Sequence, residues 1–117
     1  MDDFPIKFRF VEGIAVVSVE GELDAHTAPL LGHAFGELIA RDRHRIVLDC
    51  RELAYMSSAA FGLLIAFVEE TRDRGGSVKL ADLHYRVSDF LAAMQYPFLP
   101  PVYDTVDEAV TSFLRGD

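Results

Sequence analysis

The sequence predicts an α/β domain whose mixed, mostly parallel sheet has four to five strands and about four helices. Apolar residues alternate along the N-terminal segments, and short apolar runs then take turns with segments whose apolar residues recur every three or four positions. A chain of 117 residues is long enough for one hydrophobic core and too short for two. We therefore expect a single domain over residues 1–117.

The first two strands are expected to form an antiparallel hairpin. Apolar side chains occupy every second position of the first strand, at Phe4, Ile6, Phe8 and Phe10. Such alternation is typical of a half-buried strand. Glu12 and Gly13 form a turn signal, and the apolar segment 14–21 follows as the second strand. Because the turn is short, the two strands should pair with each other.

After the hairpin, helices and strands are expected to alternate in the order α-β-α-β-α-β-α. Amphipathic helices are indicated near residues 27–39, 58–74, 87–94 and 105–114, and strands at 45–50, 77–83 and 98–104. Asp24 or Thr27 can cap the first of these helices, and Gly75-Gly76 ends the second. This order predicts parallel strands joined by right-handed crossover helices.

Composition argues against several classes of partner. The chain has 11 basic and 19 acidic residues and a net charge of −8. Nucleic acids and anionic membranes favour basic surfaces, so neither is expected as a partner. The longest apolar run, residues 59–68, is too short to cross a bilayer. The N-terminal segment MDDFPIKF lacks the features of a signal peptide, and we expect a cytoplasmic protein without direct membrane insertion.

The familiar enzyme and metal motifs are absent from the sequence. There is no Gly-rich phosphate loop, no G-x-S-x-G elbow and no paired-histidine metal motif. The single cysteine, Cys50, lies in an apolar run and is expected to be a buried hydrophobic residue. We therefore expect no catalytic residue, no metal site and no cofactor. A hydrolase built on Ser58 and His26 is an alternative that measured ester turnover would have to support.

Two loops contain the candidate site residues. The segment GELDAHTAP (21–29) places Glu22 and Asp24 between a strand and a helix, and YMSSAAFG (55–62) places Ser57 and Ser58 at the start of another helix. Both segments can be read as turns with helix caps. A helix N-terminus also favours an anion, so a phosphate on either serine would add about −1.5 to −2 charges without disrupting the helix.

Four longer segments share their pattern with a known family. They are VVSVEGELDAHTAPLL, IVLDCRELAYMSSAAFGLLI, GGSVKLADL and VYDTVDEAV. Together they resemble the bacterial anti-sigma factor antagonists of the STAS domain family, from about residue 10 to residue 114. The family fold, an initial hairpin followed by alternating helices and strands, agrees with the order expected above. The resemblance implies a protein-binding module and not an enzyme.

The resemblance also implies partners and a switch. Family members bind an anti-sigma factor, often a serine kinase related to histidine-kinase ATPase domains, and so free a sigma factor. The kinase phosphorylates a serine of the antagonist, and a PP2C-type phosphatase removes the phosphate. The acceptor position of the family falls on Ser58, with Ser57 as the less favoured choice and as the expected helix cap. The partner-binding residues are then expected to be Glu22, Asp24, Ser57, Ser58, Ala59 and Phe61.

The sequence departs from the family pattern Asp-Ser-Ser/Thr-Gly at three positions. Ser57 replaces the acidic residue, Ala59 the second hydroxyl residue, and Ala60 the glycine. The methyl group of Ala60 is expected to obstruct close approach of a kinase active site, because glycine has no Cβ. An alternative function is therefore a STAS subunit without phosphoregulation, in a lipid or anion transport complex.

Overall fold

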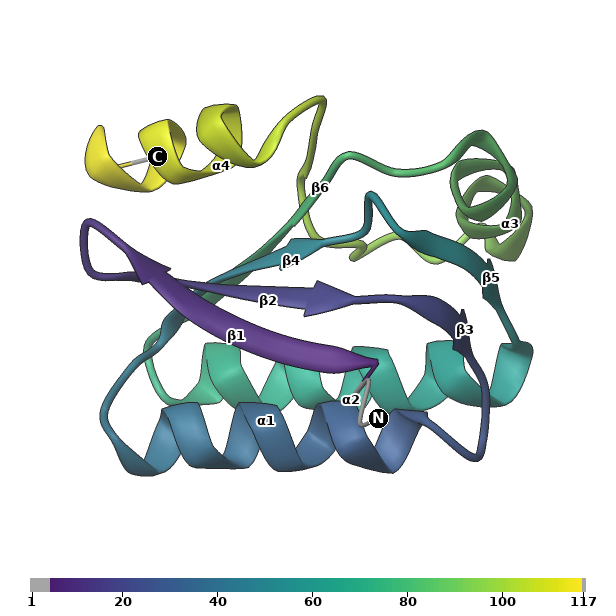
Figure 1. Ribbon diagram of the computed structural model, residues 1–117, viewed down its shortest axis with the longest axis horizontal. Helices are drawn as coiled ribbons and strands as arrows, with labels where there is room; N and C mark the ends of the chain where they lie inside the picture. The colour runs from purple at the N-terminus through teal and green to yellow at the C-terminus, as the bar shows by residue number, and fades with distance from the viewer. Residues whose placement is uncertain (1–4, 117) are drawn as a thin grey trace.

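A computed structural model describes residues 5–116 and confirms the α/β class (Figure 1). The strands are β1 (Ile6–Val11), β2 (Ile14–Val19), β3 (Gly21–Leu23), β4 (Arg45–Asp49), β5 (Leu53–Met56), β6 (Ser77–Ala81) and β7 (Val102–Tyr103). The helices are α1 (Ala28–Ala40), α2 (Ser58–Asp73), α3 (Tyr85–Met94) and α4 (Val106–Leu114). The main sheet has the order β1-β2-β4-β6-β7, with β1 antiparallel to β2 and the other neighbours parallel.

The expected hairpin of β1 and β2 is confirmed. The register pairs Val11 with Ile14, so Glu12 and Gly13 make the turn between the strands. Both turn residues have positive φ angles, 50° and 83°, as the two-residue turns that suit twisted hairpins require. Phe4, which the alternation assigned to the first strand, lies outside the described residues.

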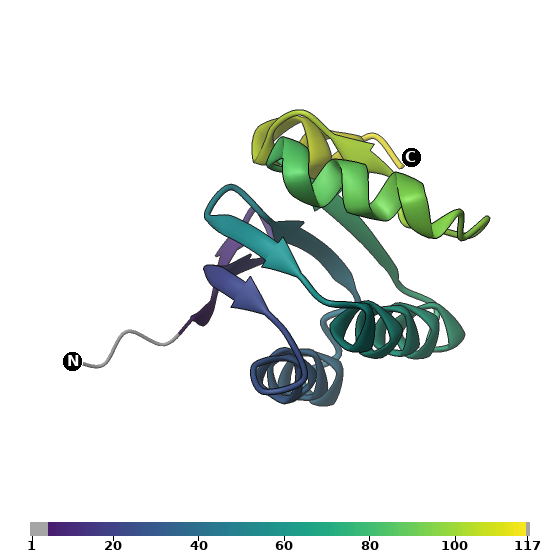
Figure 2. The same ribbon diagram turned by 90° about the vertical axis from the view of Figure 1, so that its right-hand side faces the viewer.

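Helices cover the two faces of the main sheet unequally. α1 and α2 lie side by side on one face, and α4 lies on the other (Figure 1). α3 packs near β5, at one end of the sheet (Figure 2). The larger core lies between the sheet and the α1–α2 layer, and the core beneath α4 is much smaller. The arrangement matches the expected order of crossovers after a hairpin.

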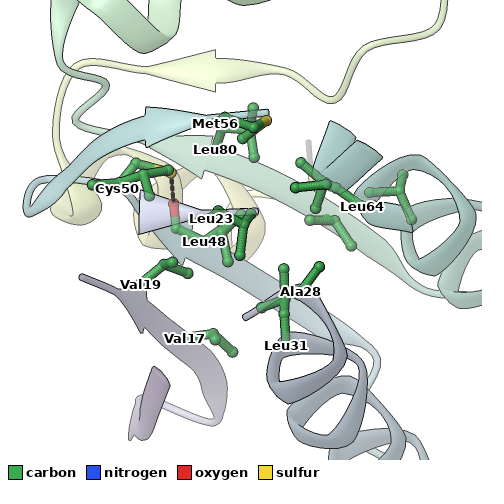
Figure 3. Packing of buried hydrophobic residues seen from close by; sticks show 14 of the residues in the cluster. Val17, Val19, Leu23, Ala28, Leu31, Leu48, Cys50, Met56, Leu64 and Leu80 are labelled. Carbon is green, nitrogen blue, oxygen red and sulfur yellow. Dashed lines mark hydrogen bonds between the residues drawn. The ribbon is translucent and has the colours of Figure 1, made fainter. Parts of the chain in front are cut away.

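The larger core joins the strands to α1 and α2 without a break. Leu31 of α1 and Leu64 of α2 are fully buried and point toward Leu48 and its neighbours on the sheet (Figure 3). Cys50 follows β4 into this core, with 1% of its surface exposed. Burial raises the pKa of the Cys50 thiol to about 12, so the thiol stays protonated at neutral pH. The expectation of a buried hydrophobic cysteine is confirmed.

A two-stranded parallel sheet, which the sequence pattern does not predict, extends this end of the domain. In it β3 pairs with β5, so that Glu22 lies opposite Tyr55 and Leu23 opposite Met56. β3 directly follows β2, and β5 follows β4 after a short turn, so the small sheet continues the main one (Figures 1 and 2). It places two loops that are distant in sequence next to each other.

The end of α2 requires both glycines of the Gly75-Gly76 pair. Gly75 has a φ of +85°, which favours glycine. The Gly76 N–H donates to the Thr71 carbonyl oxygen at 3.0 Å. A Cβ atom on Gly76 would lie 2.2 Å from the carbonyl oxygen of His44. The predicted end of this helix is therefore confirmed within one residue. The backbone of His44, in the loop before β4, leaves no room for a side chain on Gly76.

The face beneath α4 contains a buried lysine. Lys79 of β6 is 2% exposed, and its ammonium lies over the Phe113 ring, 4.0 Å from the centroid. The same ammonium donates to the Ser112 hydroxyl oxygen. Cation–π contact and hydrogen bonding compensate for part of the cost of burying the charge. β7, at the nearby edge, has two residues and is shorter than the expected strand 98–104.

Candidate functional site

The two candidate loops lie side by side at the end of the domain formed by β3 and β5 (Figure 2). β3 leads into the loop that contains Asp24, and β5 leads into α2. Parallel pairing brings the carboxyl ends of both strands to the same edge. The Ser57 N–H then donates to the Leu23 carbonyl oxygen at 2.9 Å. A backbone hydrogen bond therefore fixes the start of α2 against the first loop.

Ser57 is the N-cap of α2, as expected. Its backbone is extended, with φ −86° and ψ 163°, and its hydroxyl oxygen accepts a hydrogen bond from the Ala60 N–H at 3.1 Å. This contact satisfies one of the N–H groups that a helix start leaves without an intrahelical partner. The Ser57 hydroxyl is therefore engaged in structure.

Ser58 is the first residue of α2, and its side chain is exposed. The first turn of α2 contains no acidic residue. The N–H groups of a first helical turn point toward the N-terminal end, where the macrodipole is positive. The Ser58 hydroxyl thus lies at the surface, beside a helix end that favours negative charge.

The three neighbours of Ser58 differ in exposure. Ala59 is exposed, whereas Ala60 is fully buried and Phe61 is 7% exposed. The Ala60 methyl group therefore lies within the domain, and the expected obstruction of an approaching kinase does not apply. Phe61 packs edge-on against Phe90 and Tyr96, with ring centroids 6.1 and 6.0 Å away. These rings cover most of the Phe61 side chain, so it offers a partner little surface, and its role in partner binding stays a prediction.

Asp24 braces the first loop through its carboxylate. Its Oδ1 accepts hydrogen bonds from the N–H groups of Thr27 at 3.1 Å and His26 at 2.9 Å. These bonds, that from Thr27 first, hold the pKa of Asp24 below its ordinary value. Thr27 stands at the N-cap position of α1, but its side chain caps no helical N–H; the hydroxyl donates to the Glu22 carbonyl oxygen at 2.9 Å. Neither Asp24 nor Thr27 therefore caps α1 with its side chain.

A hollow of about 380 Å³ adjoins these loops and contains residues that the sequence analysis missed. It is lined by Glu22, Ala54, Tyr55, Met56, Arg86 and Phe90. The Tyr55 side chain is 50% exposed although it lies in a strand, because it is on the outer face of the β3–β5 sheet opposite Glu22. In the sequence, the available signal for this hollow was a tyrosine in the short segment LAYM. That tyrosine can be assigned to an exposed face only once the segment is known to pair with β3.

The structure provides no support for the hydrolase alternative. His26 is exposed, and within residues 5–116 it shares no hydrogen bond with Ser58. Within the same residues, no three His, Cys, Asp or Glu side chains are grouped so that they could hold a metal ion. Among the described helices, none is both long and apolar enough to span a membrane.

Comparison with known proteins places this fold in a family. The model of the STAS domain matches residues 5–109. The chain is 27% identical over 107 residues to an anti-sigma F factor antagonist of Paenibacillus polymyxa, covering 91% of this chain and 92% of that protein. It is 36% identical over 67 residues to the anti-sigma-F factor antagonist RsfB of Mycobacterium tuberculosis, covering 57% of this chain and 52% of RsfB.

A solved structure shows the same fold. The unphosphorylated form of the anti-sigma factor antagonist SpoIIAA of Bacillus superposes with a TM-score of 0.72 at 20% identity, over 96% of this chain and 99% of that one. Its likeness extends through the hairpin and the alternating helices and strands. The match of the domain model over nearly all described residues, on this fold, shows that the chain belongs to the STAS domain family.

Proposed function

We propose that this STAS domain, residues 1–117, is an anti-sigma factor antagonist that binds an anti-sigma factor of the serine-kinase type and thereby releases a sigma factor. The observation that carries the proposal is the hydrogen bond from the Ser57 N–H to the Leu23 carbonyl oxygen. It joins the two predicted loops into one preformed surface. The names of the relatives from Paenibacillus polymyxa and Mycobacterium tuberculosis support the same function.

We call this surface the docking surface and define it by Glu22, Asp24, Ser57, Ser58 and Ala59. Glu22, Ser58 and Ala59 are exposed and contact the partner directly. Asp24 keeps the first loop in shape through the N–H groups of Thr27 and His26. Because the loops are already ordered, binding loses little conformational entropy.

Phosphate on Ser58 acts as the switch. The kinase transfers the γ-phosphoryl group of ATP to the Ser58 hydroxyl, which loses its proton as ADP leaves, and a PP2C-type phosphatase hydrolyses the ester with water to restore the hydroxyl and release inorganic phosphate. The phosphate is tolerated by the fold because it lies at the positive end of α2. It adds about −1.5 to −2 charges beside Glu22 and Asp24, on a surface that must lose water on binding. Docking is therefore weakened.

The buried Ala60 favours this switch over the alternative of an unregulated subunit in a lipid or anion transport complex. That alternative was suggested by the loss of the family glycine at this position. Since the Ala60 side chain is 0% exposed, its methyl group leaves the approach to Ser58 open. The exposed Ser58 hydroxyl remains accessible to a kinase.

The test uses the full chain and each serine-kinase-type anti-sigma factor of its source organism, produced as purified proteins. Wild type should bind one of them by calorimetry and take up phosphate on Ser58, located by mass spectrometry. Ser58→Ala should bind but take up no phosphate. Ser58→Asp should bind at least about tenfold more weakly, a loss of about 1.4 kcal/mol. Ser88→Asp, at an exposed serine of α3, is the matched control and should bind normally.

Two results would contradict the proposal at different levels. Equal binding by Ser58→Asp and wild type would remove the switch while keeping the antagonist function. If wild type bound none of these anti-sigma factors, the antagonist function itself would be contradicted. Co-purification with a membrane transport protein from native cells would then favour the transport-complex alternative.

A further inference from the structure

The outer edge of β1 presents backbone groups that point away from the sheet. The Glu20 N–H donates to the Pro5 carbonyl oxygen at 2.8 Å, and Val11 pairs with Ile14 at the turn. Hydrogen-bonded pairs alternate along an antiparallel ladder. The residues whose N–H and C=O groups point outward are therefore Ile6, Phe8 and Phe10. β1 is the edge strand of the main sheet, so these groups can accept another strand.

A groove runs between this edge and α1. It has a volume of about 460 Å³ and is lined by Pro5, Ile6 and Phe8 at the β1 edge and by Leu30, His33, Ala34 and the acidic Glu37 of α1. Leu30 is 40% exposed and Phe10, further along the same face of β1, is 42% exposed. Ile6 and Phe8 therefore direct their backbone groups outward and also line this groove. A strand added to β1 would place every second side chain in it.

Basic side chains surround the β1 edge in a chain whose net charge is −8. Lys7 and Arg9 alternate with the apolar residues and so lie on the opposite face of β1. At the other face, Arg41 and Arg43 lie over the rings of Phe8 and Phe10, 5.7 and 5.1 Å from their centroids. The carboxylate of Glu20 pairs with Lys7 at 3.8 Å and compensates part of this charge. Glu37 lies further along the groove wall, and the four basic side chains near β1 favour a segment whose acidic residues face Lys7 and Arg9.

We propose that the β1 edge binds an extended segment of a partner protein as an added strand, and that apolar and acidic residues alternate in this segment. Backbone hydrogen bonds to Ile6, Phe8 and Phe10 give affinity, as in other cases of strand addition. The apolar side chains enter the groove against Phe8 and Leu30. The acidic side chains, on the other face, lie beside Lys7 and Arg9 and set the specificity.

A second copy of this chain fits the same edge poorly. Two β1 strands that pair antiparallel about Phe8 would set Lys7 opposite Arg9. Like charges directly opposite each other destabilise a strand pair, and each such pairing would bring two basic side chains together. The occupant is therefore a different protein, and this edge is separate from the docking surface around Ser58.

The test follows the amide signals of the full-length protein by NMR while a blocked peptide, acetyl-EVEIEVE-amide, is added. Saturable shifts are expected at Ile6, Phe8 and Phe10 and at Leu30 across the groove. The matched peptide acetyl-KVKIKVK-amide should bind at least about tenfold more weakly, since it opposes the basic residues. Added salt should weaken binding of the acidic peptide.

Two protein variants separate the edge from the groove. Phe8→Pro removes an outward N–H, a change that an edge strand tolerates, whereas Phe8→Leu keeps the N–H. Phe8→Pro should bind the acidic peptide at least about tenfold more weakly than Phe8→Leu, as expected for one lost hydrogen bond. Leu30→Glu, at an exposed helix position, should weaken binding without reducing stability.

Three results would overturn the proposal. The first is equal binding by Phe8→Pro and Phe8→Leu together with normal binding by Leu30→Glu. The second is an absence of peptide-induced shifts along β1, or shifts confined to the docking surface. The third is a concentration-dependent dimer, seen by sedimentation without peptide and abolished by Phe8→Pro, which would make a second copy the occupant.

Discussion

The N-termini of α2 and α4 share one kind of cap and differ in the charge of the turn that follows. The Ser57 hydroxyl oxygen accepts from the Ala60 N–H, and the Thr105 hydroxyl oxygen accepts from the Glu108 N–H, each at 3.1 Å. Asp107 and Glu108 are the acidic residues in the first turn of α4. The first turn of α2 has none.

The start of α4 therefore carries negative charge of its own, whereas the start of α2 can accept an added negative charge. In α4, Thr105 and Glu108 have the spacing of a capping box, and two carboxylates lie at the positive end of the macrodipole. Ala59 and Ala60 occupy the corresponding positions in α2. With alanine at both positions, the first turn of α2 has no acidic side chain that would repel a phosphate.

Truncating a core side chain of α2 or of α4 should have the largest effect on stability, and the effect should be similar for the two helices. Leu64 is 0% and Phe113 5% exposed, so Leu64→Ala and Phe113→Ala should each lower the free energy of unfolding by about 2–5 kcal/mol. Urea unfolding measures this loss. A loss below about 1 kcal/mol in either variant would contradict the packing of these two side chains in the core.

The Cys50 thiol, buried with a pKa of about 12, should react with a thiol reagent only as the chain unfolds.

Giving α2 the first-turn charge of α4 should affect binding more than stability. Ala59→Glu places a carboxylate at the position that Asp107 holds in α4. It should raise the free energy of unfolding by about 0.3–1 kcal/mol and weaken binding of the anti-sigma factor at least about tenfold, or about 1.4 kcal/mol. Calorimetry and urea unfolding measure the two effects. The reverse exchange, Asp107→Ala, should leave binding unchanged, and a matching loss there would show that the effect is not local.

Removing the caps should have equal, smaller effects on stability. Ser57→Ala and Thr105→Ala each delete a hydroxyl that accepts from a helical N–H, and each should cost about 1 kcal/mol. Ser57→Asn and Thr105→Asn keep an acceptor and should restore most of this loss. Thermal unfolding of the four variants measures the differences. A negligible cost for Ser57→Ala would mean that this hydroxyl is free and would reopen its assignment as cap.

The smallest expected effect is a pH response confined to the Asp24 loop. Hydrogen bonds from the N–H groups of Thr27 and His26 lower the pKa of Asp24 below its ordinary value of 3.8. The stabilisation is therefore fully present above pH 3.8 and is lost as the pH falls through the lower folded-state pKa. The Thr27 and His26 amide signals should move only in that acidic range, and Asp24→Asn should abolish the movement. A transition at a higher pH would contradict the described bonds.

The sequence was sufficient for elements whose pattern is local. Alternation in the segment of Ile6 to Phe10 predicted the hairpin, and three- and four-residue spacing predicted α2 as residues 58–74 against the observed Ser58–Asp73. The serine cap was also predictable, because Ser57 needs only the N–H of Ala60, three residues away. Local pattern could not decide between Asp24 and Thr27 as caps of α1, since both side chains bond within the preceding loop.

The rest could not be predicted because it depends on contacts between distant segments. β3 and β5 have three and four residues, too few for an alternation to be visible. The exposure of Tyr55 follows from their pairing, and the burial of Phe61 beneath Phe90 and Tyr96 follows from the position of α3. Lys79 is buried because Ser112 and Phe113 of α4 reach across it. None of these contacts leaves a signal in the nearby sequence.

The parallel ladder between β3 and β5 has a consequence for redesigning this domain. The register pairs Glu22 with Tyr55 and Leu23 with Met56, and a slip of one residue would turn every side chain of either strand to the other face. A chimera that takes only residues 21–27 from a relative would combine one strand with a foreign neighbour. Grafting this surface from one STAS domain onto another therefore requires residues 21–27 and 53–61 to be transplanted together.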